Sequence, residues 1–476
     1  MDLSKIFKAY DIRGVYPDEI DEKKVKRIAM AYARLLQQSH QPSAVSHQPM
    51  VVAVGRDVRL SGPKLQKAVI DGLTEAGVNV EDIGPVPTDM LYFAVGFYHF
   101  DGGIQVSASH NPKEFNGLKM VRQGVEAISS DSGLNEIREL AESNQTLSAL
   151  TPGKLATKEV EEDYFDYLTK FVHFDSGEAM RSRFPSGTMD TAPNLKIVAN
   201  NNFGLSGNIA QKFLNRIHND HIQLIELNFE PDGNFPKGRP DPLQKENRQE
   251  TSELIVETKA DFGVAWDADG DRCYISDERG EVIEGSHLTA LLGVHLLKDN
   301  QGQKILYDPR NIWAVEESVK ASGGVALLNK AGHTFIKNRM RQEDALFAGE
   351  SSGHYYFRDF YYADNGLIPL LLVLNIISKS SKKVSEIVAP LRDKYPVSGE
   401  MNFEVPDKEK VTKLIEKRYG DGVVDRTDGL SVSFDSWRFN LRSSNTENLL
   451  RLNVEARSKK TCDERAAELS GIVKSA

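Results

Sequence analysis

The sequence lacks the features that would tie the chain to an oxidising compartment or to a membrane. Its 476 residues include two cysteines, Cys273 and Cys462, which are far apart and show no metal-ligand spacing, so no disulfide framework is indicated. The first five residues lack the basic-then-apolar pattern of a signal peptide. The most apolar stretch, residues 367–377, is too short to cross a bilayer and contains Pro369, so we expect it to form a core helix. These absences predict a cytoplasmic protein without a membrane partner.

The sequence also lacks an excess of basic charge. Its formal net charge is −10, whereas a protein that grips nucleic acid or an anionic membrane usually needs a basic face. We therefore expect no nucleic-acid partner. A small anionic substrate is not excluded, because it needs only a local cluster of arginine, lysine and backbone N–H groups.

Apolar residues suffice for several packed cores. Hydrophobic residues make up 40% and charged residues 27%, as in ordinary globular proteins, and a single core rarely grows to this length. Apolar strands, polar or Gly-rich loops and amphipathic helices alternate, which predicts α/β domains with mixed or parallel sheets. Towards the C-terminus, residues 430–434 and 450–454 alternate with period two, which predicts a smaller antiparallel α+β domain. We place four domains at residues 1–153, 154–281, 282–393 and 394–476.

Individual segments carry clear patterns. Residues 21–36 have apolar side chains at helical spacing, and Ser61 is expected to cap a second helix that has Pro63 in its first turn. Two polar insertions, residues 37–49 and 181–194, are expected to be surface loops. Because loops at the carboxyl ends of strands carry the chemistry of α/β sheets, the motifs that follow apolar strands are the candidates for a site.

The strongest local signal is a cluster of carboxylates, Asp267, Asp269 and Asp271, directly after the apolar strand 262–266. In extended backbone, side chains at i, i+2 and i+4 point the same way. Three anions this close repel unless a cation neutralises them, and hard oxygen ligands suit Mg²⁺ or Ca²⁺. A solvated acidic turn fits poorly, because apolar residues lead in and out. The sequence therefore predicts a metal site here.

A calcium-binding EF-hand loop is the alternative for the same segment. The three aspartates fill the first, third and fifth positions of such a loop, and Glu278 falls at the twelfth. The sixth position, which needs glycine, holds Arg272, and the flanks have strand rather than helix patterns. These mismatches weigh against an EF-hand.

A second motif, residues 107–112 (Ser-Ala-Ser-His-Asn-Pro), follows the short strand 104–106 and contains Ser109 and His110. A serine hydroxyl is a weak nucleophile that needs activation or prior modification. No G-x-S-x-G elbow surrounds it, which argues against hydrolase-type acyl chemistry. Taken alone, such a serine–histidine pair is usually a turn with capping side chains.

Two further polar loops suit a phosphorylated sugar. Residues 442–447 (Arg-Ser-Ser-Asn-Thr-Glu) combine an arginine fork with hydroxyl, amide and turn N–H groups that can cradle phosphate. Residues 349–354 (Gly-Glu-Ser-Ser-Gly-His) place a carboxylate and hydroxyls in a Gly-flanked loop, which suits paired sugar hydroxyls. Each, taken alone, is explained as well or better as a polar turn.

Together and in this order, the motifs resemble the α-D-phosphohexomutase superfamily. The resemblance begins at residues 8–14 (Lys-Ala-Tyr-Asp-Ile-Arg-Gly), ends at the loop 442–447 and covers nearly the whole chain. Within the superfamily, the sequence is most similar to bacterial phosphomannomutases of GDP-mannose synthesis, on the segments 308–310, 332–337, 356–360, 425–429 and 437–442. The resemblance implies four domains around a central cleft, of which three are related α/β domains and the fourth is a smaller α+β domain.

The resemblance also implies a role for each motif. Ser109 matches the serine that carries a phosphate in the active enzyme, and that phosphate with Asp267, Asp269 and Asp271 would hold one Mg²⁺ per chain. Lys119 and His333 match positions proposed as general acid/base groups, Arg272 would lie beside the metal, and His110 is also expected to be a catalytic residue. The positions that line the cleft or bind the sugar and its non-reacting phosphate are matched by Tyr10, Arg13, Arg310, Glu350, Ser352, His354, Arg442, Ser444, Asn445, Thr446 and Arg451.

The implied reaction is the reversible conversion of mannose 6-phosphate and mannose 1-phosphate through a bisphosphorylated sugar, with a sugar 1,6-bisphosphate as activator. The implied partners are hexose phosphates, and we expect a monomer or homodimer. A phosphoglucomutase or a dual-specificity enzyme stays open, because Glu350 and Ser352 occur with either specificity. A phosphoglucosamine mutase fits the C-terminal segments less well. A non-catalytic sugar-phosphate binder would have no need for Ser109, the aspartates and Lys119 together.

Two residues depart from the family pattern near the loops. Ser351 stands where methionine is frequent, and Asn448 stands where proline usually follows the phosphate loop. Because proline rigidifies a turn, its absence is expected to loosen that loop and to affect affinity more than reaction type.

Overall fold

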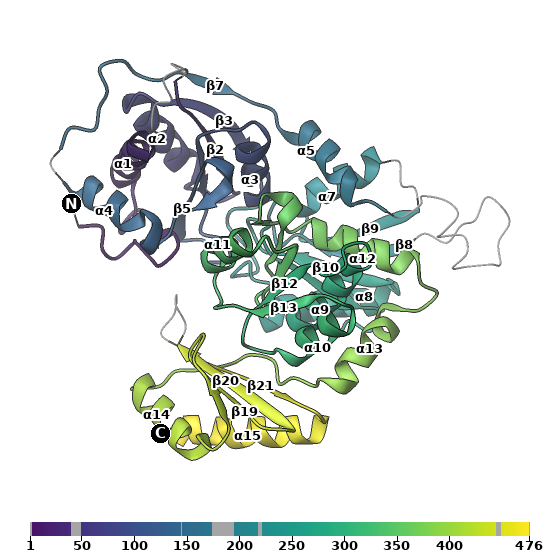
Figure 1. Ribbon diagram of the computed structural model, residues 1–476. Coiled ribbons are helices and arrows are strands. Elements are labelled where there is room, and N and C mark those ends of the chain that lie inside the picture. Colours follow the sequence, from purple (N-terminus) through teal and green to yellow (C-terminus); the bar gives the residue numbers. More distant parts are fainter. Residues whose placement is uncertain are drawn as a thin grey trace. The chain divides into compact units, whose positions relative to one another are not determined.

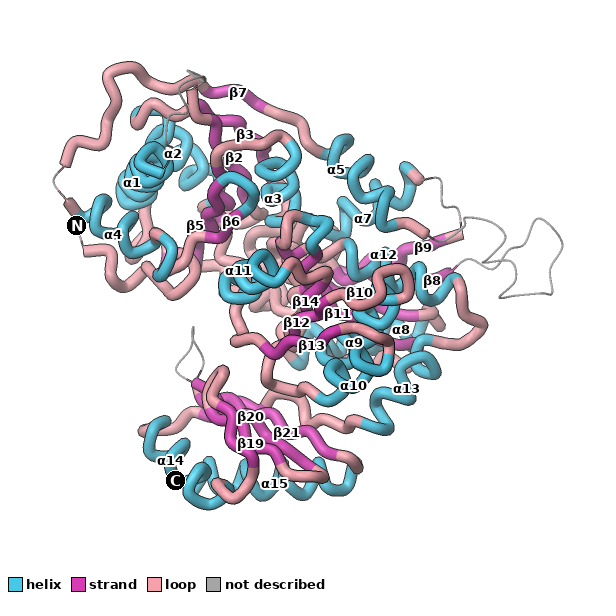
Figure 2. Tube along the Cα trace, in the orientation of Figure 1, coloured by secondary structure: helices cyan, strands magenta, loops and turns pink. Residues whose placement is uncertain are grey.

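The computed structural model describes residues 2–39, 49–143, 145–173, 195–217, 221–443 and 449–475. The chain divides into two compact units, residues 1–282 with 359–381 and residues 283–358 with 382–476 (Figure 1). Both units contain helices and strands (Figure 2). Of the two predicted surface loops, residues 181–194 lie outside the described residues. In the other, residues 40–48 lie outside them, and residues 37–39 continue a helix.

The first unit contains a seven-stranded mixed sheet. In sheet order its strands are β1 (Ile12–Val15), β5 (Phe115–Arg122), β4 (Gly102–Val106), β2 (Val51–Arg56), β3 (Asn79–Pro85) and β7 (Leu155–Thr157), with β6 (Glu126–Ala127) paired to β5. One core joins this sheet to α1 (Glu22–Ser39), α2 (Gly62–Glu75) and α4 (Leu134–Glu142). The helix predicted over residues 21–36 is α1, so that prediction is confirmed.

Two adjacent glycines in β4 let helices approach both faces of this sheet. Because strand side chains alternate, Gly102 faces α1, where an added Cβ would lie 2.0 Å from the Tyr32 hydroxyl. Gly103 faces α3 (Thr88–Phe97), where an added Cβ would lie 2.6 Å from Val95. The Tyr32 hydroxyl donates a 2.7 Å hydrogen bond to the Val121 carbonyl. β4 is thus held between helices on both faces, and the serine motif follows its carboxyl end.

The cap predicted for α2 is wrong. Ser61 has helical backbone angles, and its side chain accepts no hydrogen bond from the first turn of the described helix. Its hydroxyl instead accepts a 2.7 Å hydrogen bond from Asn116 Nδ2. Pro63 does lie in the first turn, as predicted. The local capping signal is therefore overridden by a tertiary contact that joins α2 to β5.

The second sheet of the first unit has the strand order β11 (Cys273–Asp277), β10 (Phe262–Trp266), β8 (Leu195–Asn200) and β9 (Ile222–Leu227). The same unit includes α5 (Glu161–Leu168), α7 (Ser206–Arg216), α8 (Lys245–Thr258), β16 (Ala363–Asp364) and α12 (Ile368–Ser378). The apolar stretch predicted as a core helix is α12, which is almost entirely buried, so that prediction is confirmed. Trp266 Nε1 donates a 2.8 Å hydrogen bond to the Gly366 carbonyl and ties β10 to this segment.

The second unit contains a mixed sheet and a separate antiparallel sheet. The mixed sheet includes β13 (Val325–Leu328), β12 (Lys304–Tyr307), β14 (Phe347–Gly349) and β15 (Tyr355–Phe357), and its helices are α9 (Gly285–Leu297), α10 (Trp313–Ala321), α11 (His333–Glu343) and α13 (Val384–Lys394). The antiparallel sheet has the order β17 (Met401–Phe403), β21 (Leu450–Ala456), β20 (Trp437–Ser443), β19 (Leu430–Ser433) and β18 (Val423–Asp425). It shares a core with α14 (Lys408–Tyr419) and α15 (Lys459–Ser475). The predicted small antiparallel α+β domain is confirmed.

The same four-strand arrangement occurs three times. In β3-β2-β4-β5, β9-β8-β10-β11 and β13-β12-β14-β15, the first three strands are parallel and the fourth is antiparallel to the third. The prediction of three related α/β domains with mixed sheets is therefore confirmed. In each repeat the third and fourth strands form a hairpin, and its connection carries a polar motif, at residues 107–114, 267–272 and 350–354. The exact domain boundaries stay predictions, and β7, just past residue 153, pairs with β3.

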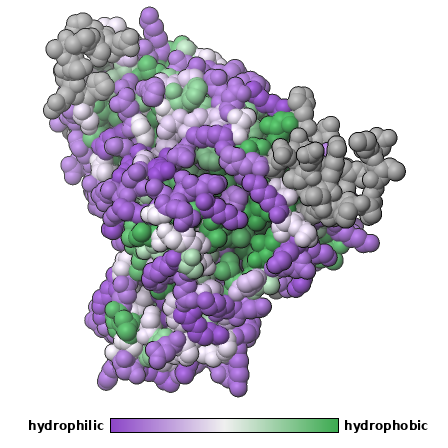
Figure 3. All heavy atoms as spheres, turned by 45° about the vertical axis from the view of Figure 1, so that its right-hand side comes forward, coloured by the Kyte–Doolittle hydropathy of each residue, from purple (hydrophilic) through white to green (hydrophobic). Residues whose placement is uncertain are grey.

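The surface matches the globular composition. The face drawn in Figure 3 carries hydrophilic side chains over much of its area, with apolar side chains gathered in groups. Within the described ranges of the chain, none of the helices is both long enough and apolar enough for a membrane span.

Candidate active site

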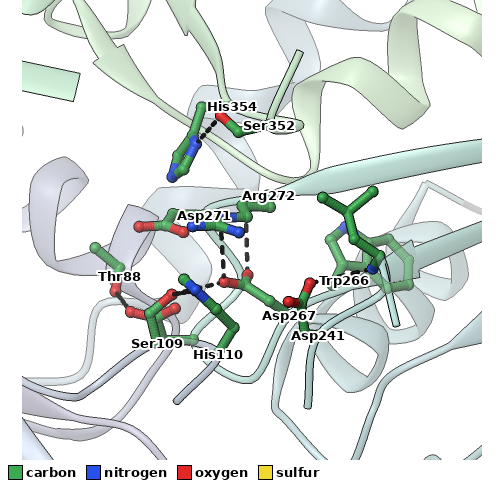
Figure 4. A network of polar contacts seen from close by, with 12 residues as sticks. Thr88, Ser109, His110, Asp241, Trp266, Asp267, Asp271, Arg272, Ser352 and His354 are labelled. Carbon is green, nitrogen blue, oxygen red and sulfur yellow. Dashed lines mark hydrogen bonds and ion pairs between the residues drawn. The ribbon is translucent and has the colours of Figure 1, made fainter. Parts of the chain in front are cut away.

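Ser109 lies on the hairpin connection between β4 and β5. Its φ of +50° falls in the left-handed region, which is uncommon for a residue other than glycine. The Ser109 N–H donates a 2.8 Å hydrogen bond to Ser107 Oγ, and the Ser109 hydroxyl donates one of 2.8 Å to Asp267 Oδ2 (Figure 4). The residue is 1% exposed. The turn therefore directs the hydroxyl towards the carboxylate cluster.

His110 is the second side chain against this hydroxyl. Its Nδ1 lies 3.0 Å from Ser109 Oγ (Figure 4). Burial lowers the pKa of His110 far below its ordinary value, and the charges of neighbouring arginines, Arg272 first, lower it further. The imidazole is therefore neutral. With its proton on Nδ1, it donates to Ser109 Oγ while the hydroxyl donates to the carboxylate.

A buried arginine, Arg59, holds the serine loop through its backbone. Asp57 accepts hydrogen bonds from the Arg59 N–H at 2.9 Å and from Nε at 3.2 Å, and both residues are fully buried. The rest of the fork donates, at 2.6–2.9 Å, to the carbonyl oxygens of Ser109, Asn111, Pro112 and Phe115. A planar guanidinium with five donors can hold a loop in this way, whereas a lysine cannot.

Arg13 in β1 holds the same loop through a side chain. Its Nη1 donates to Asn111 Oδ1 at 2.6 Å and to the Ala108 carbonyl at 3.3 Å, while its Nε donates to Asp11 Oδ2 at 2.7 Å. Tyr10, just before β1, is half-buried. The serine loop is therefore held from β1 and from the loop that follows β2.

The aspartates Asp267, Asp269 and Asp271 lie on the tight connection of the β10–β11 hairpin. The predicted extended backbone is wrong here: the Gly270 N–H donates to the Asp267 carbonyl at 3.1 Å and Gly270 has φ +71°, so the segment is a turn. The turn still brings one carboxylate oxygen of each aspartate within 4.8 Å of the others, and all three residues are buried. The flanking segments are strands, which excludes the EF-hand alternative.

Asp269 joins this turn to the serine-bearing sheet. Its Oδ2 accepts hydrogen bonds from Thr88 Oγ1 at 2.8 Å, Ser107 Oγ at 2.9 Å and Lys119 Nζ at 2.6 Å. Lys119 also forms an ion pair with Asp271. The other oxygen, Asp269 Oδ1, is buried and accepts no hydrogen bond from any residue that the structure describes. Since buried acceptors are normally satisfied, this oxygen favours a further ligand such as a cation.

The charges of the cluster do not balance. Burial raises the pKa of Asp267, and repulsion from Asp271 and Asp269 raises it further. Burial lowers the pKa of Lys119, but the two aspartates at its ammonium outweigh burial and raise it above its ordinary value, so Lys119 stays charged. Arg272 Nε lies 3.8 Å from Asp267 Oδ2. Three carboxylates thus face two cations, and such hard oxygen donors suit Mg²⁺.

In the second unit, Arg310 repeats the arrangement of Arg59. Asp308 accepts hydrogen bonds from the Arg310 N–H at 2.9 Å and from Nε at 3.0 Å. This Asp-x-Arg motif follows β12, as the first one follows β2, and the two strands hold the same place in the repeated sheet. Arg310 Nη2 donates to Glu350 Oε1 at 3.3 Å. Each arginine therefore holds the hairpin connection of its own sheet.

The Glu350 carboxylate is already engaged by protein donors. Besides Arg310, it accepts hydrogen bonds from the Gly332 N–H at 3.0 Å and from the Tyr356 hydroxyl at 2.6 Å. Gly332 precedes half-buried His333, the first residue of α11. Glu350 thus anchors the start of α11 as well as the Arg310 fork.

Ser352 and His354 lie on the same connection and are half-buried. Ser352 Oγ lies 3.1 Å from His354 Nδ1, and that nitrogen lies 3.7 Å from Glu350 Oε2 (Figure 4). These three side chains form one polar group on the β14–β15 hairpin.

Arg442 and Arg451 face each other across β20 and β21. Glu400, just before β17, lies 3.3 Å from Arg442, 3.2 Å from Arg451 and 3.8 Å from Arg310. The structure therefore brings the three predicted arginines together around one carboxylate. The remaining predicted loop residues, Ser444, Asn445 and Thr446, and the departure Asn448 lie outside the described residues.

Comparison with known proteins covers almost the entire chain. Four family models match, described as phosphoglucomutase/phosphomannomutase alpha/beta/alpha domain I (residues 4–148), domain II (162–280), domain III (284–395) and C-terminal domain (400–472). The chain belongs to the phosphoglucomutase/phosphomannomutase family. A phosphomannomutase of Vibrio cholerae is 39% identical over 474 residues, 98% of each chain. Phosphohexose mutases of Xanthomonas campestris are 40% identical over 471 residues, 98% of this chain and 99% of theirs.

Solved structures agree with the family assignment. A phosphoglucomutase/phosphomannomutase family protein from Burkholderia thailandensis is 29% identical, with a TM-score of 0.84 over 100% of this chain and 98% of that one. The predicted superfamily and the prediction of an enzyme are both confirmed: as a member of the phosphoglucomutase/phosphomannomutase family, the chain is an intramolecular phosphotransferase.

Two residues of the candidate site, Arg59 and Thr88, were not predicted from the sequence. Arg59 lies in a polar loop directly after an apolar strand, the same signal that identified the serine and aspartate motifs, and its Asp-x-Arg spacing recurs at Arg310. Comparing the two spacings could have found it. Thr88, which donates to Asp269, stands at the start of α3 and carries no such signal.

Proposed function

We propose that this chain interconverts mannose 6-phosphate and mannose 1-phosphate through a phosphate carried on Ser109. The proposal rests on the buried Ser109 hydroxyl, 2.8 Å from Asp267 at a cluster of three carboxylates. Relatives that are 39% identical and described as phosphomannomutases support mannose. Relatives described as phosphohexose mutases favour the alternative, a phosphoglucomutase or a dual-specificity enzyme.

The carboxylate cluster would bind one Mg²⁺. Its oxygen donors suit a hard cation, and Asp269 Oδ1 accepts no hydrogen bond within the described part of the chain. The proposed ligands are Asp267, Asp269, Asp271 and the phosphate on Ser109. When bound, Mg²⁺ would withdraw charge from the phosphoryl group and stabilise its transfer.

Proton transfer would fall to side chains of the enzyme. In each half-reaction the attacking hydroxyl loses a proton and the leaving oxygen gains one. Lys119 stays protonated between two aspartates that raise its pKa, which suits a charge stabiliser better than a base. His110 is neutral and orients Ser109 Oγ, and we assign the base to His333 on the family resemblance.

The second unit would hold the sugar and its non-reacting phosphate. Ser352 and His354 offer hydroxyl and imidazole groups to the sugar, while Glu350 has only the acceptor capacity that its protein donors leave. The proposed phosphate ligands are Arg310, Arg442 and Arg451, with the predicted loop residues Ser444, Asn445 and Thr446. Arginine forks of this kind suit phosphate oxygens.

The cycle would start from phosphorylated Ser109. Its phosphoryl group passes to the free hydroxyl of a hexose monophosphate. The resulting bisphosphate then turns around in the site, so that its other phosphate faces Ser109. The bisphosphate then returns its other phosphoryl group to Ser109, so that no phosphate is gained or lost. A sugar 1,6-bisphosphate from solution would charge an unphosphorylated enzyme and so act as activator.

The sugar assignment is tested by turnover on mannose 1-phosphate and glucose 1-phosphate. We expect kcat/KM to be higher for mannose 1-phosphate, by about tenfold if one sugar hydroxyl decides the preference. Both sugars should be measured with the same bisphosphate activator and Mg²⁺. A clear preference for glucose 1-phosphate would overturn the mannose assignment, and equal values would establish the dual-specificity alternative.

Arg59 is expected to matter to turnover although we do not place it against the substrate. Arg59→Lys keeps the charge but removes most of the hydrogen bonds that fix the Ser109 loop, and a shift of about 1 Å in a reacting group can cost about 100-fold in kcat. We expect that loss in kcat with little change in KM. Exposed Arg426→Lys is the control. An unchanged kcat in a folded Arg59→Lys variant would contradict this role.

We propose that the protein is a cytoplasmic monomer or homodimer. Both cysteines are free and buried, which agrees with a reducing compartment. Analytical ultracentrifugation over a range of protein concentrations distinguishes the two assembly states.

A further inference from the structure

Glu400 occupies the centre of an arginine group that the proposed function gives to phosphate. Burial raises the pKa of Glu400, but the charges of Arg310, Arg451 and Arg442 outweigh burial and lower it. The carboxylate is therefore ionised and acts as the anion that these arginines share. A substrate phosphate at Arg442 would need some of the same donors.

The backbone positions of the three arginines are set without Glu400. The β20–β21 pairing places Arg442 and Arg451 directly opposite each other, and Arg442 Nη2 in addition donates a 3.3 Å hydrogen bond to Glu400 Oε2. Arg310 is fixed by Asp308, at 2.9 and 3.0 Å. Because like charges directly opposite on paired strands repel, the cross-strand pair needs an anion, whether Glu400 or a phosphate supplies it.

Glu400 is held loosely compared with the other ion pairs of this group. Its contacts to the arginines are 3.2–3.8 Å long, and its side chain is 22% exposed, whereas those of Arg310 and Asp308 are 4% and 1% exposed. The preceding residue, Gly399, has φ +71°. A Cβ added to Gly399 would have Glu284 Oε1 as its nearest atom, at 3.8 Å. The segment before Glu400 is therefore not tightly packed, and the partly exposed carboxylate has access to solvent.

The donors around Glu400 are also not fully used. Arg442 is 6% exposed, and its Nε is buried without a hydrogen-bond acceptor among the residues described. Burial lowers the pKa of Arg442, and the charge of Arg310 lowers it further. An added anion would relieve both the unmet donor and the repulsion between these two arginines.

We propose that Glu400 is a built-in competitor of the substrate phosphate. It neutralises the cross-strand pair of Arg442 and Arg451 when no phosphate is bound, and it gives way when one binds. This inference rests on the proposed function, because it takes Arg442 as a ligand of the non-reacting phosphate. Competition by Glu400 would weaken phosphate binding and speed release of the sugar bisphosphate from the arginines. The bisphosphate must leave them in order to change its orientation within one turnover.

The test is the affinity of Glu400→Gln for inorganic phosphate, measured by calorimetry at fixed ionic strength. Removing one charge at about 4 Å from the anion site is expected to lower the Kd roughly tenfold. KM for mannose 6-phosphate should fall in parallel while kcat does not rise. Glu404→Gln is the matched control, since it removes an equal charge from an exposed position four residues along the same segment and should leave the Kd unchanged.

The opposite role, in which Glu400 organises the arginines, predicts weaker phosphate binding in Glu400→Gln. Weaker, unchanged or undetectable binding in that variant overturns the proposal. If Glu400→Gln does not fold, Glu400→Asp decides, because it keeps the charge but withdraws the carboxylate and should also tighten phosphate binding. If the wild type turns over no mannose phosphate, the proposed function is wrong. The phosphate titration would still decide whether Glu400 competes with phosphate for the arginines.

Discussion

Ser109→Ala is expected to reduce turnover of mannose 1-phosphate by on the order of 10⁴-fold or more. Without the hydroxyl there is no atom to carry the phosphoryl group between the two half-reactions. Substrate binding should persist, because the proposed phosphate and sugar ligands lie in the second unit. The measurements are kcat in a coupled assay and the Kd of mannose 6-phosphate by calorimetry.

The control for this variant is Ser148→Ala, an exposed serine whose hydroxyl bonds only to Glu75 among the contacts described. It should keep full turnover. Intact-protein mass adds an independent readout, because wild-type protein treated with a sugar 1,6-bisphosphate should gain one phosphoryl group and Ser109→Ala should not. Full turnover in Ser109→Ala would remove the phosphoserine mechanism, whatever the mass shows.

The motifs that follow strand ends could be predicted from the sequence because their signals are local. The apolar strand 262–266 and the three aspartates after it are visible in one short window, and so are the serine motif and the alternation of residues 430–434. The fold places the serine and aspartate motifs in loops at the carboxyl ends of strands, as predicted, and these loops are the connections of equivalent hairpins. Predictions of this kind depend on chain neighbours, which the sequence states directly.

What the sequence could not give are contacts between distant segments. Arg59 donates a hydrogen bond to the Ser109 carbonyl, some fifty positions away in the chain. The Ser61 hydroxyl accepts a hydrogen bond from Asn116 and does not cap its helix as predicted. Glu350 was predicted to bind sugar hydroxyls, but the fold gives most of its acceptor capacity to Arg310, Gly332 and Tyr356. Pairing of this kind depends on tertiary packing, which local propensity does not determine.

The aspartate turn also shows that three side chains can cluster as predicted although the backbone geometry predicted for them is wrong. Extended backbone would have aligned Asp267, Asp269 and Asp271 by alternation, whereas the structure gathers them by a turn at Gly270. Glycine is needed there, because an added Cβ would lie 1.8 Å from Ser206 Oγ. The metal hypothesis survives, since it depends on where the oxygens lie rather than on the backbone that brings them there.

Removal of divalent cations is expected to reduce turnover by about 1,000-fold or more, since the loss of one charge-stabilising contact already lowers kcat by about 100- to 1,000-fold. Burial and the neighbouring aspartates raise the pKa of Asp267, so the cluster disfavours added negative charge and would repel a phosphoryl group on Ser109 unless a cation is bound. Chelation followed by dialysis, with Mg²⁺ added back, measures the effect. Mg²⁺ should restore full turnover.

Asp269→Asn and Asp261→Asn each remove one negative charge, but only Asp269→Asn changes a proposed metal ligand. Comparing them distinguishes an effect on metal binding from an effect of net charge. The amide keeps an oxygen for Thr88 and Ser107 but loses the negative charge, so the Mg²⁺ concentration for half-maximal turnover should rise about 10- to 100-fold, the range found when metal-site partners are removed. Asp261→Asn, at the other end of β10 where the side chain accepts from the Lys196 N–H, should leave the Mg²⁺ dependence unchanged. If the chelated wild type keeps full turnover and Asp269→Asn has an unaltered Mg²⁺ dependence, the three aspartates serve only to pair with Lys119 and Arg272, and the transferred phosphate must be stabilised by those two cations alone.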